Sequence, residues 1–366
     1  MELDTKKWLY DIALSQKGVN NIVNRHLQPS SRDLYEFDNM YTINNKKKIK
    51  LPDECVVACY GCGKKTHTLH SNYVYSCVKC GKKFEKYRYY YTSQANKTAV
   101  VTGVRTKLGH QICLKLLRAG AFVYGTTRFP EKALSIFEGY PDYNVWKDRL
   151  VLYSLDFDTN NQEQVISKFV NELKEKTIDI LINCAAQTIR CREKKNITFS
   201  SSEEEKNRYG DAKFVDSKNV NSWNMCLGDY TQNEMEELFR INAIAPVILT
   251  QHLLFLLSKS VKPFIINVHA KEGLFETHKT GKHIHSNMAK SALHMFTRCV
   301  SGNYPHINIH GCDPGWFSID EYELEGSPWI VPPLDEIDGA ARVLYPLWKN
   351  LNTKEKTRRH FDMMSY

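Results

Sequence analysis

The feature that most constrains the fold is a regular alternation of short apolar stretches with amphipathic ones from about residue 97 onward. The apolar stretches are rich in Val and Ile, which is typical of strands buried on both faces. The stretches between them repeat their apolar residues with helical spacing. We expect strands at 97–103, 122–127, 150–157, 178–186, 262–270 and 307–315, and helices at 110–120, 162–175, 235–257, 287–300 and within 329–348.

This order predicts an α/β fold, in which helices cover both faces of a doubly wound parallel sheet of the Rossmann type. We assign this domain to residues 96–366. A polar N-terminal extension, 1–54, and a cysteine-containing module, 55–95, precede it. The long helix at 235–257 would have to tolerate Pro246.

Two cysteine pairs in the module have the spacing of a metal site. Each reads Cys-x-x-Cys-Gly, and the glycine suits a tight turn that points backbone N–H groups at a thiolate. Four thiolates form the usual closed structural zinc site, which folds a module without catalysing a reaction. Cys55, His67 and His70 could replace a cysteine, but we interpret them as surface residues. We therefore predict a zinc-ribbon-like module with the ligands Cys59, Cys62, Cys77 and Cys80.

The positive charge is concentrated in the same module. The chain has 50 Lys and Arg residues against 41 acidic residues, a net charge of +9, and most of the excess lies in 59–98. Basic side chains interleaved with tyrosines suit a nucleic-acid surface, so residues 55–95 could bind nucleic acid or a protein partner. The alternative is that the rings pack inside a small metal module and the lysines keep it soluble.

Composition narrows the class of protein. With 42% hydrophobic and 25% charged residues, the chain is apolar enough to build a core, which excludes a disordered protein. We find no apolar run long enough for a membrane span, and the charged start Met1–Asp4 is unlike a secretory signal. We expect a cytoplasmic protein with no membrane contact and with reduced cysteines.

The segment 102–109, TGVRTKLG, ends the first strand and opens a helix. A glycine turn at a helix N-terminus is an anion site for a pyrophosphate. The spacing resembles the T-G-x-x-x-G-x-G signature of short-chain dehydrogenase/reductases. Gly103 and Gly109 match that signature, and Lys107 stands at its middle glycine.

Further segments over about 97–350 resemble this family in the same order. On the cofactor side, the resemblance implies that Asp156 meets the adenine and that Asn183–Ala186 replaces the family's N-N-A-G. On the reaction side, Asn242 matches the active-site asparagine, Ser286–Lys290 stands at the Y-x-x-x-K motif, and 313–316 matches a Pro-Gly turn.

More narrowly, the chain resembles an atypical branch that pairs a Cys-x-x-Cys zinc module with the dehydrogenase fold. The branch motifs T-G-G-R-x-K-I-G, T-T-R-F-P and H-T-N-M-A-K correspond here to 102–109, 126–130 and 285–290. On this comparison Lys107 is a feature of the branch. Val104 replaces one of its glycines, which tightens the loop while keeping its length.

The residues after the second strand select the cofactor. An acid there would hold the ribose hydroxyls of NAD(H), but the chain has Thr126-Thr127-Arg128. Arg128, helped by Arg105 and Lys107, could hold a 2′-phosphate, which favours NADP(H) over NAD(H). The candidate cofactor-binding residues are Gly103, Arg105, Lys107, Leu108, Gly109, Arg128, Asp156, Asn183, Ala185 and Lys290.

The family's catalytic tyrosine is missing. The resemblance assigns Lys290 to the ribose and Asn242 to a proton-relay water, but it places Ser286 at the tyrosine and Ala270 at the serine. An aliphatic hydroxyl is a far weaker acid than a phenol, whose pKa is about 10. Another acid would have to serve, and His285, beside Ser286, is the best candidate, ahead of His283 and His269.

Two functions therefore remain. The first is an NADP(H)-dependent oxidoreductase with a non-standard proton donor, which acts on a small carbonyl, alcohol or C=C substrate. The second is a catalytically weak nucleotide-binding scaffold whose module binds nucleic acid or a protein. The chain has a long polar insertion at 190–230. The segment 221–223, toward its end, could return to the mouth of the pocket.

Overall fold

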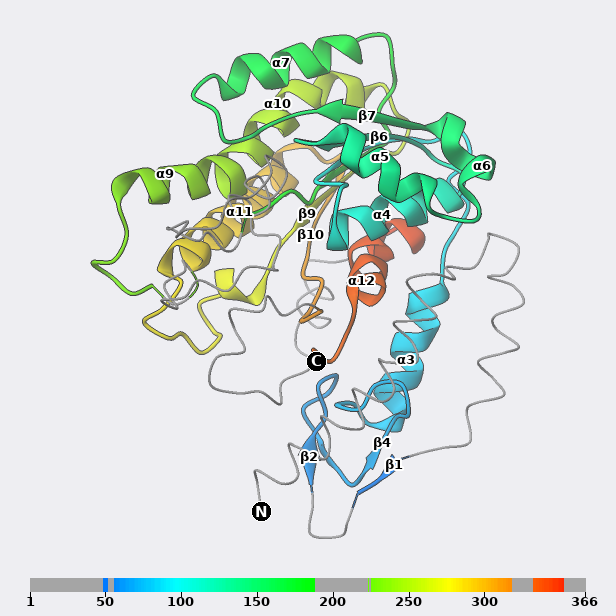
Figure 1. Ribbon diagram of the computed structural model, residues 1–366, viewed down its shortest axis with the longest axis vertical. Helices are drawn as coiled ribbons and strands as arrows, with labels where there is room; N and C mark the ends of the chain where they lie inside the picture. Colours follow the sequence, from blue (N-terminus) through cyan, green and yellow to red (C-terminus); the bar gives the residue numbers. More distant parts are fainter. Residues whose placement is uncertain (1–48, 52–55, 188–222, 224, 318–331, 352–366) are drawn as a thin grey trace, which may run out of the picture.

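The computed structural model describes residues 49–51, 56–187, 223, 225–317 and 332–351. At its centre lies a six-stranded, wholly parallel sheet with the order β10-β9-β8-β5-β6-β7 (Figure 1). Each expected strand is present, so the predicted doubly wound fold is confirmed. The strands are β5 (Thr98–Thr102), β6 (Phe122–Thr127), β7 (Leu150–Ser154), β8 (Ile180–Asn183), β9 (Phe264–Val268) and β10 (Asn308–Cys312).

Two layers of helices cover the sheet. Those of the α/β domain are α4 (Lys107–Arg118), α5 (Pro130–Glu138), α6 (Tyr143–Trp146), α7 (Gln162–Glu172), α9 (Gln232–Phe239), α10 (Ala245–Ser258), α11 (Ile284–Asn303) and α12 (Glu336–Trp348). Buried residues of α4 and α12 form one core cluster with the sheet, and those of α7 and α10 form another on the opposite face.

The strand β5 shows why the strands of this sheet are continuous apolar runs in the sequence. Ala99 and Val101 belong to the cluster under α4, while Val100 between them belongs to the cluster under α10. Side chains alternate between the faces of a strand, so a strand covered on both faces must be apolar throughout. Strand order reverses between β5 and β8, and a ligand crevice is expected at the carboxyl ends of the strands there.

The helix predicted over 235–257 is present as one helical run, Gln232–Ser258. A π-helical turn, η2 (Arg240–Ile244), lies between its α-helical parts α9 and α10. Pro246 lies in the first turn of α10, directly after the π-helical turn. The π turn places Asn242 next to the carboxyl end of the sheet, a common arrangement at functional sites.

The run Gln232–Ser258 has the length and apolar character of a membrane-spanning helix, but 56% of its most apolar window is buried inside the protein. Such burial is what a core helix of an α/β domain shows, so the run is weak evidence for a membrane span.

The module consists of short antiparallel strand pairs and one helix, α3 (Val78–Tyr89). The strand β1 (Ile49–Lys50) pairs with β4 (Thr68–Leu69), and β2 (Val57–Ala58) pairs with β3 (Lys65–Thr66). We expected a second glycine turn after the second cysteine pair, but this pair lies at the start of α3 instead. Gly63 makes the predicted turn with φ of 69°, whereas Gly81 lies inside α3.

Gly81 serves close packing against His70. A Cβ atom on Gly81 would lie 2.2 Å from Cγ of His70. The expectation that His70 is a surface residue is therefore wrong, because it is only 3% exposed and its Nε2 lies 3.4 Å from Glu85. His67 is exposed, as expected. Cys55, residues 1–48 and most of the 190–230 insertion lie outside the described residues, and the domain boundaries stay a prediction.

Candidate functional site

The phosphate turn is built from two glycines that cannot carry a side chain. Gly103 has φ of 77°, and a Cβ atom there would lie 2.9 Å from Cα of Ala185. A Cβ atom on Gly109 would lie 2.2 Å from the carbonyl oxygen of Gly103. The N-terminus of α4 therefore approaches the turn closely, and Ala185, after β8, lies directly beside it.

The departures from the family signature have local explanations. Lys107 adopts the left-handed conformation, with φ of 48°, at the position where the family has a glycine. Val104 is fully buried, and its Cγ2 atom lies 2.8 Å from where a Cβ atom on Gly125 would be. The glycine in β6 thus makes room for Val104. Leu108 packs into the core under α4.

Three cations gather at the end of β6. The guanidinium carbons of Arg105 and Arg128 lie 5.3 and 5.7 Å from the centre of the Phe129 ring, and Nζ of Lys132 lies 5.1 Å from it. Arg105 belongs to the phosphate turn between β5 and α4, whereas Arg128 and Lys132 come after β6 in the chain. Sequence reasoning missed Lys132, although its place one turn into α5 from Phe129 was a usable signal. The cluster has the charge and position to hold a phosphate group.

Two other predicted cofactor residues make contacts within the protein. Asn183 is buried, and its Nδ2 donates to Oδ1 of Asn267 at 2.8 Å and to Oγ1 of Thr250 at 3.2 Å, which ties β8 to β9 and α10. Oδ1 of Asp156 accepts from the N–H of Asp158 at 2.9 Å and shapes the turn after β7. Their roles toward a cofactor stay predictions.

Lys290 and Ser286 lie one turn apart on the same face of α11. Lys290 is buried, its Nζ donates to the carbonyl oxygen of Val268 at 3.0 Å, and burial lowers its pKa. The Cys184 thiol lies near it: burial raises the pKa of Cys184 to about 12, and the charge of Lys290 acts in the opposite direction. At the family's serine position, the carbonyl oxygen of Ala270 lies 3.1 Å from Nε2 of His294.

His285 is buried but lies on another side of α11, facing α9. Its Nδ1 lies 2.8 Å from the phenol oxygen of Tyr230, and burial raises the pKa of Tyr230 to about 12. Both side chains line a small pocket, together with Gln187, Met225, Glu234, Glu237 and Leu238. Sequence reasoning missed Tyr230, because the polar stretch before α9 carries no periodic signal.

The other two histidine candidates have different surroundings. Nε2 of His269 lies 2.8 Å from Oγ1 of Thr297, and the His269 ring fits where Gly311 has no side chain. His283 has a left-handed backbone, with φ of 42°, and its ring stacks on Trp223 with centroids 4.2 Å apart. Trp223 thus lies beside the start of α11, while Asn221 and Ser222 lie outside the described residues. That 221–223 returns to the mouth of the pocket stays a prediction.

Asn242 holds the loop after β8. Its Oδ1 accepts from the N–H of Gln187 at 2.7 Å, and its Nδ2 donates to the carbonyl oxygen of Gln187 at 2.6 Å. Gln187 also lines the pocket beside His285. Asn242 therefore positions backbone at the carboxyl edge of the sheet.

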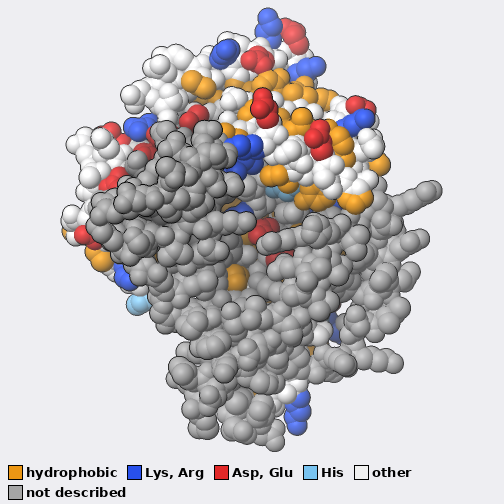
Figure 2. All heavy atoms as spheres, in the orientation of Figure 1, with side chains coloured by type: hydrophobic (Ala, Val, Ile, Leu, Met, Phe, Trp, Pro, Cys, Tyr) orange, Lys and Arg blue, Asp and Glu red, His pale blue; other side chains and the backbone are white. Residues whose placement is uncertain are grey.

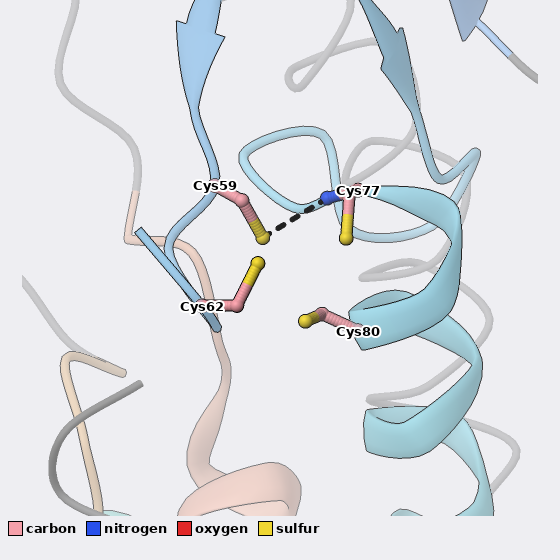
Figure 3. Close-up of side chains that lie close together, drawn as sticks. All are labelled: Cys59, Cys62, Cys77 and Cys80. Atoms are coloured by element: carbon pink, nitrogen blue, oxygen red, sulfur yellow. Dashed lines mark hydrogen bonds between the residues drawn. The ribbon is translucent and has the colours of Figure 1, made fainter. Parts of the chain in front are cut away.

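The four predicted cysteines come together (Figure 3). Cys59 and Cys62 lie in the turn after β2, and Cys77 and Cys80 lie at the start of α3. Their sulfur atoms all lie within 4.8 Å of one another. Tetrahedral Zn–S bonds of about 2.3 Å put sulfurs roughly 3.8 Å apart, so small side-chain rotations close this set round an ion.

Backbone donors also suit a thiolate at Cys59. The N–H of Cys77 donates to Sγ of Cys59 at 3.1 Å. Burial acts to raise the pKa of Cys59, but hydrogen bonds from the backbone of Cys77, Cys62 and Gly61 outweigh it and lower the pKa to about 7. The N-terminus of α3 adds a favourable dipole. The donor set fits a structural zinc ion.

The aromatic residues of the module mostly pack against other parts of the protein. Tyr73 and Phe84 are buried, and the Tyr87 ring meets Tyr345 of α12 edge-on at 4.9 Å. The exposed basic residues include Lys64, Lys65, Lys79, Lys82 and Lys86. On the face that Figure 2 shows, acidic and basic side chains are interspersed over the upper part of the molecule. Binding of nucleic acid or a protein by 55–95 stays a prediction.

Comparison with known proteins relates the chain to a family. The model for short chain dehydrogenase matches residues 97–208. Uncharacterized protein R665 of Acanthamoeba polyphaga mimivirus is 35% identical over 346 residues, which is 83% of this chain and 74% of that protein. The NADPH-dependent 3-dehydrocapnine reductase of Ornithobacterium rhinotracheale is 26% identical over 204 residues, 54% of this chain and 57% of that enzyme.

Solved structures show the same fold. The RhlG/NADP active-site complex of Pseudomonas aeruginosa has a TM-score of 0.51 at 21% identity and covers 69% of this chain and 91% of that one. The short chain dehydrogenase from Shigella flexneri has a TM-score of 0.53 at 16% identity and covers 73% of this chain and 91% of that one. The chain belongs to the short-chain dehydrogenase family, whose members are oxidoreductases. Membership of the branch with a zinc module and a replaced tyrosine stays a prediction.

Proposed function

We propose that this protein is an NADP(H)-dependent oxidoreductase that acts on a small carbonyl, alcohol or C=C substrate. The observation that carries the proposal is that Arg105, Arg128 and Lys132 lie round the Phe129 ring. This ring follows β6, and no acidic residue stands at the end of that strand. Three cations there favour a cofactor with a 2′-phosphate. An NADP complex and an NADPH-dependent enzyme among the similar proteins support the same choice.

We assign the roles of the chain's own residues from the resemblance to the family and from their places in the fold. Gly103 and Gly109 shape the turn for the pyrophosphate, Arg128 holds the 2′-phosphate and Lys290 holds the ribose. The cofactor, when bound, supplies or accepts a hydride. The protein orients the nucleotide and moves a proton.

The cofactor choice is tested by calorimetric titration of NADPH and NADH. We expect tighter binding of NADPH, and Arg128→Ala should weaken NADPH by roughly 10- to 100-fold, the scale of a charged hydrogen bond, with little effect on NADH. Arg298→Ala, which removes an exposed arginine of α11, is the matched control. A preference for NADH, or unchanged NADPH affinity in Arg128→Ala, would overturn the proposal.

We also propose that His285 supplies the proton, supported by its contact with Tyr230 and by the pocket that both line. His285→Gln should lower turnover by about 10²-fold or more, the usual scale of general acid catalysis, with little change in NADPH affinity. Normal turnover in His285→Gln would show that His285 is not the proton donor.

A second candidate function is a nucleotide-binding scaffold with little dehydrogenase activity. It is favoured by Ala270 and Ser286, which leave neither the serine nor the tyrosine of the family beside Lys290. Binding of NADPH without turnover of any of a panel of carbonyl substrates would favour it over the enzyme.

We propose that the four-cysteine cluster holds one structural zinc ion. Among the described residues no cysteine is in a disulfide, and we propose a reducing compartment such as the cytoplasm. Elemental analysis should find roughly one zinc per chain. Full zinc retention in the double variant Cys77→Ser, Cys80→Ser would contradict the assignment.

A further inference from the structure

Tyr60 connects the cysteine cluster to the α/β domain. It stands between Cys59 and Cys62, and its N–H donates to the carbonyl oxygen of Tyr75 at 2.7 Å. Its phenol oxygen accepts a hydrogen bond from the N–H of Trp316 at 2.8 Å, across 256 residues of sequence.

The loop that leaves β10, Asp313–Phe317, is shaped to receive this phenol. Gly315 has φ of 77°, and a Cβ atom there would lie 2.9 Å from the Tyr60 oxygen. Oδ1 of Asp313 accepts from the N–H of Gly315 at 2.7 Å and stabilises the turn. Any side chain at Gly315 would push the module away from the loop.

Apolar packing joins the same parts. Leu334, which precedes α12, is buried in one cluster with Cys59, Cys80 and other module residues, and Phe317 packs against this cluster. The N–H of Leu334 also donates to the carbonyl oxygen of Trp316 at 3.2 Å. All four predicted metal ligands belong to this cluster or pack against it, so its packing depends on how the cysteines are held.

A buried polar contact fixes the start of α12. Arg88 of α3 lies 2.6 Å from Oδ1 of Asp335 and 3.1 Å from Oδ1 of Asp338. The Tyr73 hydroxyl donates to Oδ1 of Asp338 at 2.8 Å. Asp335 and Asp338 form the capping box of α12, so the module holds the residues that start this helix.

The loop and the start of α12 adjoin the nucleotide site. The loop follows the carboxyl end of β10, and the carboxyl ends of parallel strands form one edge, where the phosphate turn and Lys290 also lie. In α12, a Cβ atom on Gly339 would lie 3.1 Å from Leu108 of the phosphate turn and 3.4 Å from Pro314. A change in the module therefore has a short physical route to the site.

We propose that metal binding at the cysteine cluster orders the loop Asp313–Phe317, and that Tyr60 is the positioning residue that couples the two. The inference rests on the proposed zinc site and goes beyond it, because it assigns the metal a role in preparing the nucleotide-binding edge. Tyr60 acts through the loop and touches no reacting atom.

The test is amide hydrogen exchange of the peptide that covers the loop, in the metal-loaded full chain. Tyr60→Phe keeps the ring and removes the hydrogen-bond acceptor, so exchange at Trp316 should quicken by roughly five- to tenfold, the scale of one hydrogen bond. Zinc content should stay unchanged. Tyr75→Phe is the control, because Tyr75 packs against the Leu51 and Leu69 cluster and should leave the loop protected.

Removal of the metal from the wild-type chain by a chelator should expose the same peptide, and return of zinc should restore its protection. NADPH affinity should fall several-fold both in Tyr60→Phe and in the metal-free wild-type chain. The proposal is overturned if Tyr60→Phe leaves the exchange of the loop unchanged, or if the stripped chain keeps the loop protected. The exchange measurement needs no nucleotide, so a chain that fails to bind NADPH would refute the proposed function without deciding this test.

Discussion

The phosphate turn depends on single residues whose side chains, or lack of them, are set by contacts within a few ångströms. Gly109 faces the carbonyl oxygen of Gly103, and Val104 fills the space above Gly125. Lys107 holds a conformation that costs a residue with a Cβ atom about 1–2 kcal/mol. The turn thus contains two positions that only glycine can occupy and one residue, Lys107, in a strained left-handed conformation.

Gly109→Ala should distort the turn, because its Cβ atom would overlap the Gly103 carbonyl oxygen at 2.2 Å. We expect a loss of about 1–3 kcal/mol of unfolding free energy, the usual result of overpacking, and a large loss of nucleotide affinity. Urea unfolding and calorimetry measure the two effects.

Gly302→Ala in α11 is the matched control. No atom lies within 4 Å of the added carbon, and alanine should stabilise the helix by about 0.5–1 kcal/mol. Equal effects of the two substitutions would contradict the account of the turn.

The helices α3, α4 and α12 form part of the contact between module and α/β domain, and Figure 1 shows α3 alongside α12. Nζ of Lys115 in α4 donates to the carbonyl oxygen of Arg88 in the last turn of α3, at 2.7 Å. Burial lowers the pKa of Lys115 to about 7, and the charges of Arg88 and Arg118 act in the same direction. The joint between these helices therefore contains a lysine that titrates near neutral pH.

This lysine should make stability depend on pH. Between about pH 7 and the ordinary lysine value of about 10.4, the unfolded chain holds a proton that the folded chain has lost, so the unfolding free energy rises with pH. Below pH 7 both states hold the proton and this dependence ends.

Lys115→Met keeps the apolar stem and removes the charge. The difference in unfolding free energy between wild type and variant should become more favourable to the wild type as the pH is raised from 7 to 10. Urea unfolding at several pH values measures it, with the exposed Lys86→Met as control. Parallel curves for wild type and Lys115→Met would count against the assigned shift.

The molecule as a whole consists of an α/β domain with an ordinary core and a small module whose buried residues gather round four cysteines. So few apolar residues give a small module little stability without a metal or a disulfide. The large apolar clusters of the sheet need no such help.

Removal of the metal should therefore unfold the module and leave the sheet folded. In differential scanning calorimetry of the full chain, chelation should abolish or lower one transition and leave a second, zinc-independent transition. Structural zinc sites supply about 10–16 kcal/mol of apparent binding free energy at neutral pH, so the first effect should be large. Identical scans with and without chelator would show that the module folds without the ion.

Short-range patterns in the chain were sufficient to predict the parallel sheet, the glycines of the phosphate turn and the four cysteines, because strand burial, turn geometry and ligand spacing depend on residues close in sequence. Contacts between distant segments were not predictable in this way. Local spacing carries no information on the side of α11 that His285 faces, on the burial of His70 beneath Gly81, or on the hydrogen bond of Tyr60 with Trp316. These depend on how helices and loops pack against one another in the folded chain, and they determine which groups surround His285 and how the module contacts the loop after β10.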